Sequence, residues 1–472
     1  PSSPSGANER RYRLSQPQSV ANNNALESDK SDVDEATDAA QSEPPFKIVG
    51  IGASAGGLSA LKNFFGQMPS DAGVAIVVVL HLSPEHKSML AELLQPHCAM
   101  PVQQVVETVK LEPNRVYVIP PNANLEAVDT HLRLSSLEVQ RRERAPIDHF
   151  FRTLAESGDG QVIGVVLTGT GSDGTLGLWR IKERGGVTIA QDPVEAEYDG
   201  MPRSAVSDGA GDLVLPLAQI PGRATEIANL RPKVAVQESA AEPAADEGRI
   251  LSKIFAQVRA STGHDFTQYK RSTIMRRIAR RMQVREVEEI GDYLELLRND
   301  RREVISLFDD LLITVTEFFR DPHIFEKVEQ EVIPRLFENR RVEDTIRIWS
   351  VGCSTGEEAY SLAMMLLEEA TSRESFPQIQ IFATDLHDRS LRSAREGVYP
   401  DSIASDVSPE RLRRFFVSNN GSFRIRKEVR EMVIFAAHDL LKDPPFSHVD
   451  LIVCRNVLIY LQRDVQEDVM AL

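Results

Sequence analysis

The sequence has few cysteines and no long apolar segment. Its 472 residues include three cysteines, Cys98, Cys353 and Cys454, far apart and odd in number. No disulfide framework or zinc-ligand spacing can be built from them, so we expect a reducing, cytosolic environment and no metal site. The longest apolar runs, such as residues 74–80, fall far short of the roughly 20 residues of a membrane-spanning helix. We therefore expect neither a membrane span nor a signal peptide.

The chain also lacks an excess of basic residues. Its 54 Lys and Arg against 70 Asp and Glu give a net charge of −16, which argues against nonspecific binding of nucleic acid or anionic membranes over the whole surface. Gly and Pro number only 27 and 26, and hydrophobic residues make up 42%, as in ordinary globular proteins. At roughly 150 residues per domain, the length suggests about three domains.

Two polar stretches divide the chain. Residues 1–45 contain four basic residues, eight acidic residues and one aromatic, too little apolar surface to offset the entropy of ordering, so we predict a disordered segment. Residues 231–248, which include QESAAEPAADEG, predict a linker. Between them, residues 46–230 alternate strand-like and helical patterns, which predicts a mostly parallel sheet covered on both faces.

The second half repeats this alternation after a helical region. Residues 249–317 are helical in pattern and show no strands, and residues 318–472 again alternate, with TIRIWSV and VDLIVC among the expected strands. The sequence therefore predicts two doubly wound, mostly parallel α/β domains with a small all-helical domain between them. The expected strands are 46–51, 74–80, 115–119, 161–167, 345–351, 380–384, 433–437 and 449–454; the expected helices are 58–66, 87–95, 174–184, 357–370 and 389–396.

A serine, a histidine and an aspartate follow three strands of the first domain. GASAGG (52–57) matches G-x-S-x-G, which would place Ser54 at a nucleophile elbow; a phosphate-binding helix start or a tight turn are the alternatives. His81 follows the second strand, and Asp173 lies in TGTGSDG after the fourth. Because ligands bind at the carboxyl ends of parallel strands, these residues predict a hydrolytic site with a base and an orienting acid. Simple capping by His81 and Asp173 is the other interpretation.

The first domain resembles the CheB family of chemotaxis receptor methylesterases. The resemblance covers residues 46–228 and rests on GASAGG, HLSPEH, VYVIPPN, APIDHFF, LTGTGSDGTLG and AQDPVEAEYDGMPRSA. It implies hydrolysis of glutamyl methyl esters, with glutamine deamidation as a second reaction. Ser54 would be the nucleophile, His81 the base and Asp173 its orienting acid. Thr170 stands where the family usually has Met, and the family's phosphorylatable receiver domain is not expected in the short upstream segment.

A Gly-rich loop follows the first strand of the last domain. WSVGCSTGEEAYSLAMML (349–366) is neither G-x-G-x-x-G nor a P-loop, since it has no Lys at the loop. Glu357 and Glu358 argue against a bound pyrophosphate and suit the positive end of S-adenosylmethionine. Asp385 ends the next strand, where an acid commonly binds ribose hydroxyls. Helix capping by these acids is the alternative. The polar residues that close the two later strands are Asp439, Arg455 and Asn456.

Residues 249–472 resemble the CheR family of chemotaxis receptor methyltransferases, through FTQYKRSTIMRRIARRM, TEFFRDPHIF, WSVGCSTGEEAYSLA, ATDLHDRSL and DLIVCRNVLIYL. The resemblance implies methyl transfer from S-adenosylmethionine to receptor glutamates. Thr316 and Arg320 would contact the methionine end, Glu357 the amino group and Asp385 the ribose. Tyr460 would position the acceptor carboxylate, which is already nucleophilic and needs no strong base. The residues expected to line the adenosine and methyl region are Asp439, Leu440, Asn456 and Val457.

The last domain also departs from the family pattern. Thr314 and Asp439 stand where the family has Asn, and both keep polar atoms. Residues 417–429 would begin the small β subdomain that the family inserts. Leu472 falls inside the helix after strand 449–454, whereas the family continues with further strands, so we expect a methyltransferase domain that is incomplete at this end. Sensor or kinase domains fused beyond residue 472 are one expected continuation of such a chain.

The pattern at 272–283 predicts a helix with one apolar and one cationic face. A solvated surface, nucleic acid and an acidic helical substrate are the possible roles of the cationic face. No aromatic residues interleave with the arginines and the chain is acidic, so nucleic acid is not expected; the methylation helices of a chemoreceptor fit better. The apolar face comprises Ile274, Met275, Ile278 and Met282, and the cationic face comprises Arg276, Arg277, Arg280 and Arg281.

These features lead us to expect a cytoplasmic, bifunctional chemotaxis enzyme that removes and adds glutamyl methyl esters. The alternative is a signalling scaffold with one or both sites degenerate, favoured by Thr170, Thr314 and Asp439 and by the opposed activities. A third hypothesis is a small-molecule esterase fused to a methyltransferase of another substrate, which would also hydrolyse free methyl esters.

Overall fold

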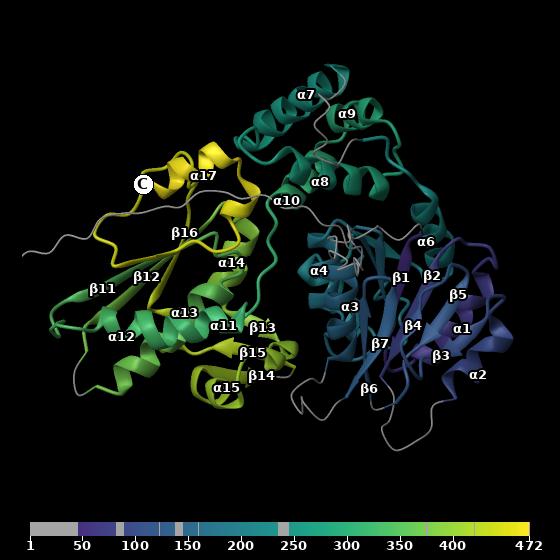
Figure 1. The fold of residues 1–472 in the computed structure, drawn as a ribbon, viewed down its shortest axis with the longest axis horizontal. Helices are drawn as coiled ribbons and strands as arrows, with labels where there is room; N and C mark the ends of the chain where they lie inside the picture. The colour runs from purple at the N-terminus through teal and green to yellow at the C-terminus, as the bar shows by residue number, and fades with distance from the viewer. Residues whose placement is uncertain are drawn as a thin grey trace, which may run out of the picture. The chain divides into compact units, whose positions relative to one another are not determined.

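The computed structural model describes residues 46–81, 89–121, 123–136, 145–158, 160–234, 245–373, 376–419 and 421–471 (Figure 1). The predicted disordered segment lies outside these ranges, and so does most of the predicted linker. Glu43–Leu472 forms one compact unit. Within the described segments, no helix is both long enough and apolar enough to cross a lipid bilayer.

The first domain is built on a seven-stranded parallel sheet. Alternate residues of its central strands enter two separate cores, with Val49 and Ile51 on one face and Val77 and Val79 on the other. Both faces are therefore buried, which explains the continuous apolar runs in the sequence. The strand order is β10 (Leu213–Leu215), β9 (Val187–Gln191), β8 (Val162–Val166), β1 (Ile48–Ala53), β2 (Ala75–Leu80), β5 (Arg115–Val118) and β3 (Val102–Gln104).

Helices cover both faces of this sheet. One face carries α1 (Gly57–Gln67), α2 (Leu90–Leu94) and α6 (Ile220–Asn229), and the other carries α3 (Pro146–Ser157), α4 (Thr175–Glu183) and α5 (Gly200–Asp208). A three-stranded antiparallel sheet that the sequence did not predict has the order β4 (Val109–Lys110), β7 (His131–Ser136) and β6 (Ala123–Val128).

The chain reverses direction across the sheet next to β1. From β1 it proceeds through β2 to β5 on one side, whereas β8, β9 and β10 extend on the other side. The gap between β1 and β8 is therefore a topological switch point, where α/β proteins bind ligands at the carboxyl ends of the strands.

Four helices form the second domain: α7 (Ala245–Thr262), α8 (Arg271–Val284), α9 (Ile290–Asn299) and α10 (Arg301–Leu311). Their apolar faces share one core, in which Ile274 and Met282 of α8 are fully buried. Helix α7 starts at Ala245, inside the stretch 231–248 that the sequence predicted as a linker. Asp246 and Glu247 lie in its first turn, where acidic side chains stabilise a helix.

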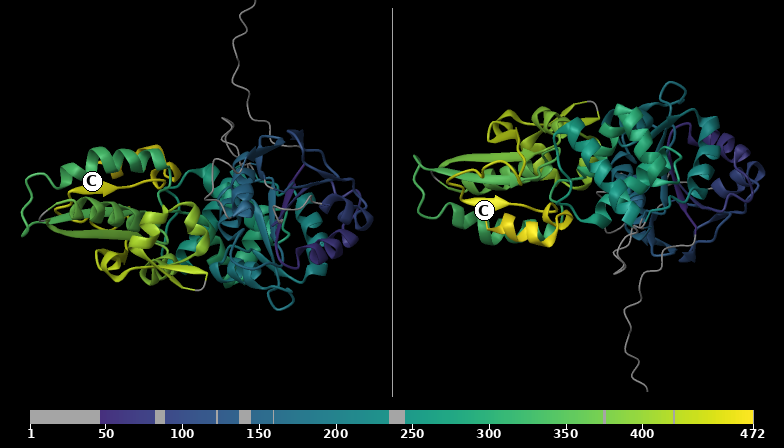
Figure 2. Two further views of the ribbon diagram at one scale, coloured as in Figure 1. Left: turned by 90° about the horizontal axis from the view of Figure 1, so that it is seen from below. Right: turned by 90° about the horizontal axis from the view of Figure 1, so that it is seen from above.

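The third domain has a four-stranded parallel sheet in the order β16 (Val433–Ala437), β12 (Gln378–Asp385), β11 (Thr345–Val351) and β17 (Leu451–Val453). Helices lie on both faces of this sheet (Figure 2). The fold class predicted from the sequence, two doubly wound domains around a helical one, is confirmed.

Shorter elements complete the third domain. The predicted hairpin near 417–429 is present and gains a third strand, in the order β13 (Val398–Pro400), β15 (Ser422–Ile425) and β14 (Phe416–Asn419). The helices are α11 (Pro322–Lys327), η4 (Val328–Val332), α12 (Ile333–Leu336), α13 (Glu357–Thr371), α14 (Asp388–Glu396), η5 (Asp401–Ser405), α15 (Pro409–Phe415), α16 (Lys427–Arg430), η6 (Leu458–Tyr460) and α17 (Arg463–Met470).

Candidate functional site

Strand register brings Ser54 and His81 together. The parallel pairing of β1 with β2 sets Ala53 opposite Leu80 at the ends of the two strands. The next residue of each strand therefore emerges at the same level of the carboxyl edge. There the Ser54 Oγ lies 3.0 Å from Nδ1 of His81, within reach for proton transfer.

Asp173, after β8, lies on the other side of the imidazole. Its Oδ2 is 2.7 Å from Nε2 of His81, and its carboxylate accepts the N–H groups of Ile147 and Asp148 at 3.1 and 2.8 Å. A proton on Nε2 leaves Nδ1 free to accept the serine proton. Burial and the charge of Asp173 raise the pKa of Asp148 well above its usual range.

The serine lies at the start of α1, in a close-packed turn. Gly56, the N-cap residue, has a φ of 73°, which a residue without Cβ adopts without strain. Backbone N–H groups at a helix N-terminus can stabilise an oxyanion formed next to Ser54. Thr170, which departs from the family pattern, is exposed on the loop after β8.

Gly169 leaves no space for a side chain beside the nucleophile. A Cβ there would lie 2.2 Å from Sδ of Met201 and 2.8 Å from Cβ of Ser54. We expect Gly169→Ala to displace the serine and to lower ester hydrolysis by roughly 100-fold, since a misplacement of about 1 Å can have that effect. Hydrolysis of a methyl ester would be measured against Gly171→Ala, because a Cβ at Gly171 meets no atom within 4 Å. Because Gly171 has a φ of 81°, Gly171→Ala is itself expected to lower hydrolysis somewhat. The expected result is a larger loss of hydrolysis in Gly169→Ala than in Gly171→Ala, and equal losses would contradict the prediction.

A cavity lies at the carboxyl ends of all four strands of the third domain. The helical domain contributes Tyr269 to its wall, and the segment that connects the two domains contributes Thr316 and Arg320. Every predicted cofactor residue except Glu357 lines it, as does Tyr460. The lining residues from the strand ends are Gly352, Ser354, Asp385, Leu386, His438, Asp439, Leu440, Arg455, Asn456 and Val457.

Asp385 organises the Gly-rich loop at this cavity. Its two carboxylate oxygens accept the N–H groups of Ser354 and His387, each at 2.8 Å, and burial raises its pKa above the ordinary value. Ser354 and Asn456 have φ values of 49° and 56°. Left-handed backbone is uncommon in non-glycine residues, and such positions cluster at active sites and ligand-binding turns.

The two glutamates at the start of α13 point to different places. Glu357 accepts the Thr355 hydroxyl at 2.6 Å and faces a second cavity, whereas Glu358 lines the first and accepts the Ser350 hydroxyl at 2.8 Å. The sequence motif pointed to Glu357 for the amino group, but the geometry favours Glu358. Burial raises the pKa of both carboxyl groups to about 7. The sequence motif shows two adjacent glutamates and does not indicate which of them faces the cavity.

The arginine face of α8 does not point to solvent. Arg277, Arg280 and Arg281 are 5%, 1% and 7% exposed, and Arg276 is half-buried. Arg281 forms two bonds with Glu303, at 2.9 and 2.6 Å, inside the helical domain. In this arrangement these three side chains are not open to an acidic substrate, contrary to the expectation of an exposed cationic face, because other parts of the chain already bind the guanidinium groups.

Three family models match the chain. The model of the CheB methylesterase matches residues 49–224. The model of the CheR methyltransferase all-alpha domain matches residues 250–312, and that of the CheR methyltransferase SAM binding domain matches residues 314–472. S-adenosylmethionine is therefore the cofactor of the third domain.

Relatives cover the two halves together and separately. A 104.1 kDa protein of Rhodobacter capsulatus without an assigned function is 39% identical over 80% of this chain, which spans 42% of that protein's length. A chemotaxis protein methyltransferase of Listeria innocua is 34% identical over 43% of this chain and 75% of its own length.

The first half of the chain is similar to methylesterases of known name. A protein-glutamate methylesterase/protein-glutamine glutaminase of Geobacter sulfurreducens is 36% identical over 39% of this chain and 52% of its own length. The chain therefore belongs to the CheB methylesterase family in residues 49–224 and to the CheR methyltransferase family in residues 250–472.

Proposed function

We propose that this chain removes methyl esters from glutamate side chains at one site and adds them at another. The observation that carries the proposal is that each half assembles its chemically necessary groups at the carboxyl edge of its own parallel sheet. The substrates would be cytoplasmic methylation helices of chemoreceptors or similar signalling proteins, and the chain would act in the cytoplasm. Sensor or kinase domains fused beyond residue 472 would connect it to such a pathway.

Ester hydrolysis would proceed through Ser54. Nδ1 of His81 takes the hydroxyl proton as Oγ attacks the ester carbonyl, and the N-terminus of α1 stabilises the oxyanion. His81 then returns the proton to the leaving methoxide, which departs as methanol. Water, deprotonated by the same nitrogen, hydrolyses the acyl-enzyme. Asp173 holds the ring and stabilises its charged form throughout.

Methyl ester formation would take place in the cavity of the third domain, by transfer of a methyl group to a glutamate carboxylate. The cofactor, when bound, supplies an electrophilic methyl group on a sulfonium. Asp385 is placed to accept hydrogen bonds from ribose hydroxyls, and the Glu358 carboxylate to pair with an ammonium group. Tyr460 would orient the acceptor carboxylate, for which positioning and exclusion of water suffice. Arg320, expected from the resemblance to contact the methionine end, would take part in this orientation.

The first experiment is titration calorimetry of the chain with S-adenosylhomocysteine, followed by incubation with methyl-labelled S-adenosylmethionine and a chemoreceptor methylation-region fragment. One-to-one binding, transient labelling of the fragment and release of labelled methanol are expected. A folded chain that binds no S-adenosylhomocysteine would instead support the scaffold hypothesis for the second half.

Acid should weaken cofactor binding through the buried glutamates. Because their pKa values are raised to about 7, these carboxylates lose their charge as the pH falls through 7, and with it the attraction for an ammonium group. For one titrating group, affinity for S-adenosylhomocysteine should fall by roughly 30-fold between pH 8 and pH 5.5. Calorimetry would measure this, with Glu358→Gln and Glu357→Gln compared. We expect the pH dependence of binding to disappear in Glu358→Gln. If it disappeared only in Glu357→Gln, Glu357 would be the residue that binds the amino group, as the motif predicted.

A further inference from the structure

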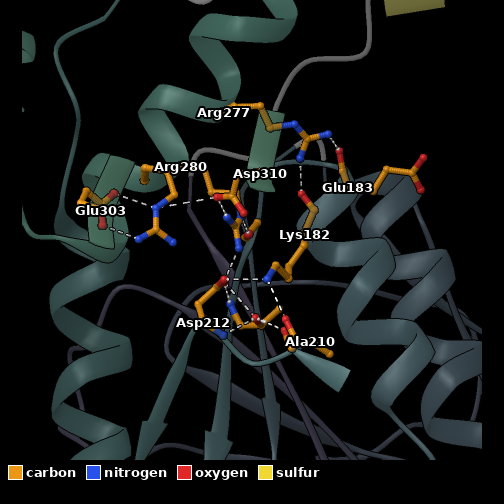
Figure 3. Close-up of polar contacts among 12 residues, drawn as sticks. Lys182, Glu183, Ala210, Asp212, Arg277, Arg280, Glu303 and Asp310 are labelled. Carbon is orange, nitrogen blue, oxygen red and sulfur yellow. Dashed lines mark hydrogen bonds and ion pairs between the residues drawn. The ribbon is translucent and has the colours of Figure 1, made fainter. Parts of the chain in front are cut away.

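Residues 182–186, called here the α4-end segment, bind helix α8 (Figure 3). Both Nη atoms of Arg277 donate hydrogen bonds to the carbonyl oxygens of Lys182 and Glu183, at the end of α4. Carbonyl groups at a helix C-terminus carry partial negative charge and attract cations. Arg277, predicted to bind an acidic helix, therefore binds a helix end of the chain's own esterase domain.

Arg280 holds the same contact through charge. Its Nε donates to the carbonyl of Gly186 at 2.8 Å, and its guanidinium pairs with Asp212 and Asp310 (Figure 3). The side chains of Arg280, Asp212 and Asp310 are 0%, 1% and 9% exposed. Arg280 therefore joins α8 to the esterase domain through a buried network of charges, in which Lys182 also pairs with Asp212 and Arg281 with Asp310.

The Glu183 side chain contacts Arg320, which lines the cavity of the third domain. One oxygen lies 3.4 Å from Nη2 of Arg320 and the other 2.8 Å from Nη1 of Arg180. Burial opposes its ionisation, but Arg180, Arg320 and Arg277 outweigh burial and lower its pKa. Burial, and after it the negative charge of Glu183, raise the pKa of the Tyr460 phenol. A charged glutamate is thus held beside Arg320, a residue of the cavity wall.

We propose that Glu183 is an internal pseudosubstrate, a glutamate carboxylate that occupies the acceptor side of the methyltransferase site while α8 grips the α4-end segment. This inference rests on the proposed methyltransferase function, and it states how access of an acceptor glutamate to that site is controlled. An acceptor glutamate on an acidic helix has to displace Glu183 and take over Arg277. The esterase site stays open meanwhile, since the His81 side chain is 31% exposed. The arrangement therefore hydrolyses esters and does not form them.

The contact between Arg277 of α8 and the α4-end segment can be tested without any methyl-accepting protein. Phenylglyoxal labels accessible arginines, and mass spectrometry measures the rate at each one. In the full chain, Arg277 should be labelled at least tenfold more slowly than Arg463, whose side chain is 92% exposed. Glu183→Lys sets a cation against Arg180 and Arg320 and should raise labelling of Arg277 at least tenfold. Glu156→Lys, at an exposed position of α3, is the matched control and should change nothing.

Methyl transfer to a chemoreceptor methylation-region fragment completes the test. Glu183→Lys, and Glu183→Gln to a smaller extent, should raise kcat/KM for the fragment at least fivefold. Affinity for S-adenosylhomocysteine and hydrolysis of a small methyl ester should stay within twofold, which also shows that the variants fold.

The outcomes separate this inference from the proposed function. Rapid labelling of Arg277 in the unmodified chain would overturn the closed contact. A rise in S-adenosylhomocysteine affinity without faster transfer would show that Glu183 competes with the cofactor carboxylate, and unchanged transfer in a chain that does methylate would show no control; either overturns the inference alone. Absence of transfer from all variants, with cofactor bound, would overturn the methyltransferase proposal and the inference together.

Discussion

Ser54→Ala is expected to lower methyl ester hydrolysis by at least about 10³-fold while leaving methyl transfer intact. The hydroxyl is the sole nucleophile in contact with Nδ1 of His81 among the described residues, and loss of a triad serine removes the covalent step altogether. What remains would come from the oxyanion-stabilising N–H groups and from substrate binding. The measurement is release of methanol from a methylated receptor fragment, with binding of S-adenosylhomocysteine recorded on the same preparation.

Asp173→Asn is the companion to this variant. It keeps the shape of the acid but removes its charge and disturbs the two N–H bonds from the start of α3. We expect a loss of about 10⁴-fold in kcat with little change in KM, because the ring would be held in the wrong tautomer. Equal hydrolysis by Ser54→Ala and the unmodified chain would end the assignment of this site as a serine hydrolase.

Asp385→Ala should abolish detectable binding of S-adenosylhomocysteine, with a loss of affinity of at least about 100-fold. Two hydrogen bonds from ribose hydroxyls to a charged acceptor are together worth roughly 3 kcal/mol or more. The substitution also releases the N–H groups of Ser354 and His387, so the Gly-rich loop loses its anchor. Titration calorimetry of the unmodified chain and the variant measures the effect.

Asp385→Asn separates the two contributions to this loss. The amide retains an oxygen that can accept one of the loop N–H groups but carries no charge, so we expect an intermediate affinity. Hydrolysis of methyl esters should be unchanged in both variants, because Asp385 belongs to the other half. Full affinity in Asp385→Ala would place the cofactor elsewhere in the chain.

The positions of the esterase residues could be predicted from sequence because they depend on local order. Ser54, His81 and Asp173 each follow an apolar run that is unmistakably a buried strand, and parallel strands end at a common edge. Strand β9, by contrast, contains Thr188 and Gln191, and β6 contains Asn124 and Glu126, so neither gives a strong apolar pattern. Their identity depends on the sheet neighbours they find in the folded chain.

The orientation of individual side chains at the second site could not be predicted. Glu357 and Glu358 are adjacent, and a change of rotamer decides which one faces the cavity. The arginines of α8 were correctly placed on one face, but helical spacing cannot reveal that a separate domain covers that face. Contacts between domains, such as Arg280 with Asp212, join residues far apart in the chain and leave no periodic signal.

The grip of α8 on the α4-end segment has a consequence for the balance of opposed reactions. Separate enzymes can be adjusted by making more of one than the other, but a single chain fixes their stoichiometry at one to one. Two open sites of this kind would consume S-adenosylmethionine and release methanol without net modification of the receptor. A contact in which Glu183 keeps one site closed turns this futile cycle into an alternation, so that the methylation set point follows from conformation and not from gene dosage.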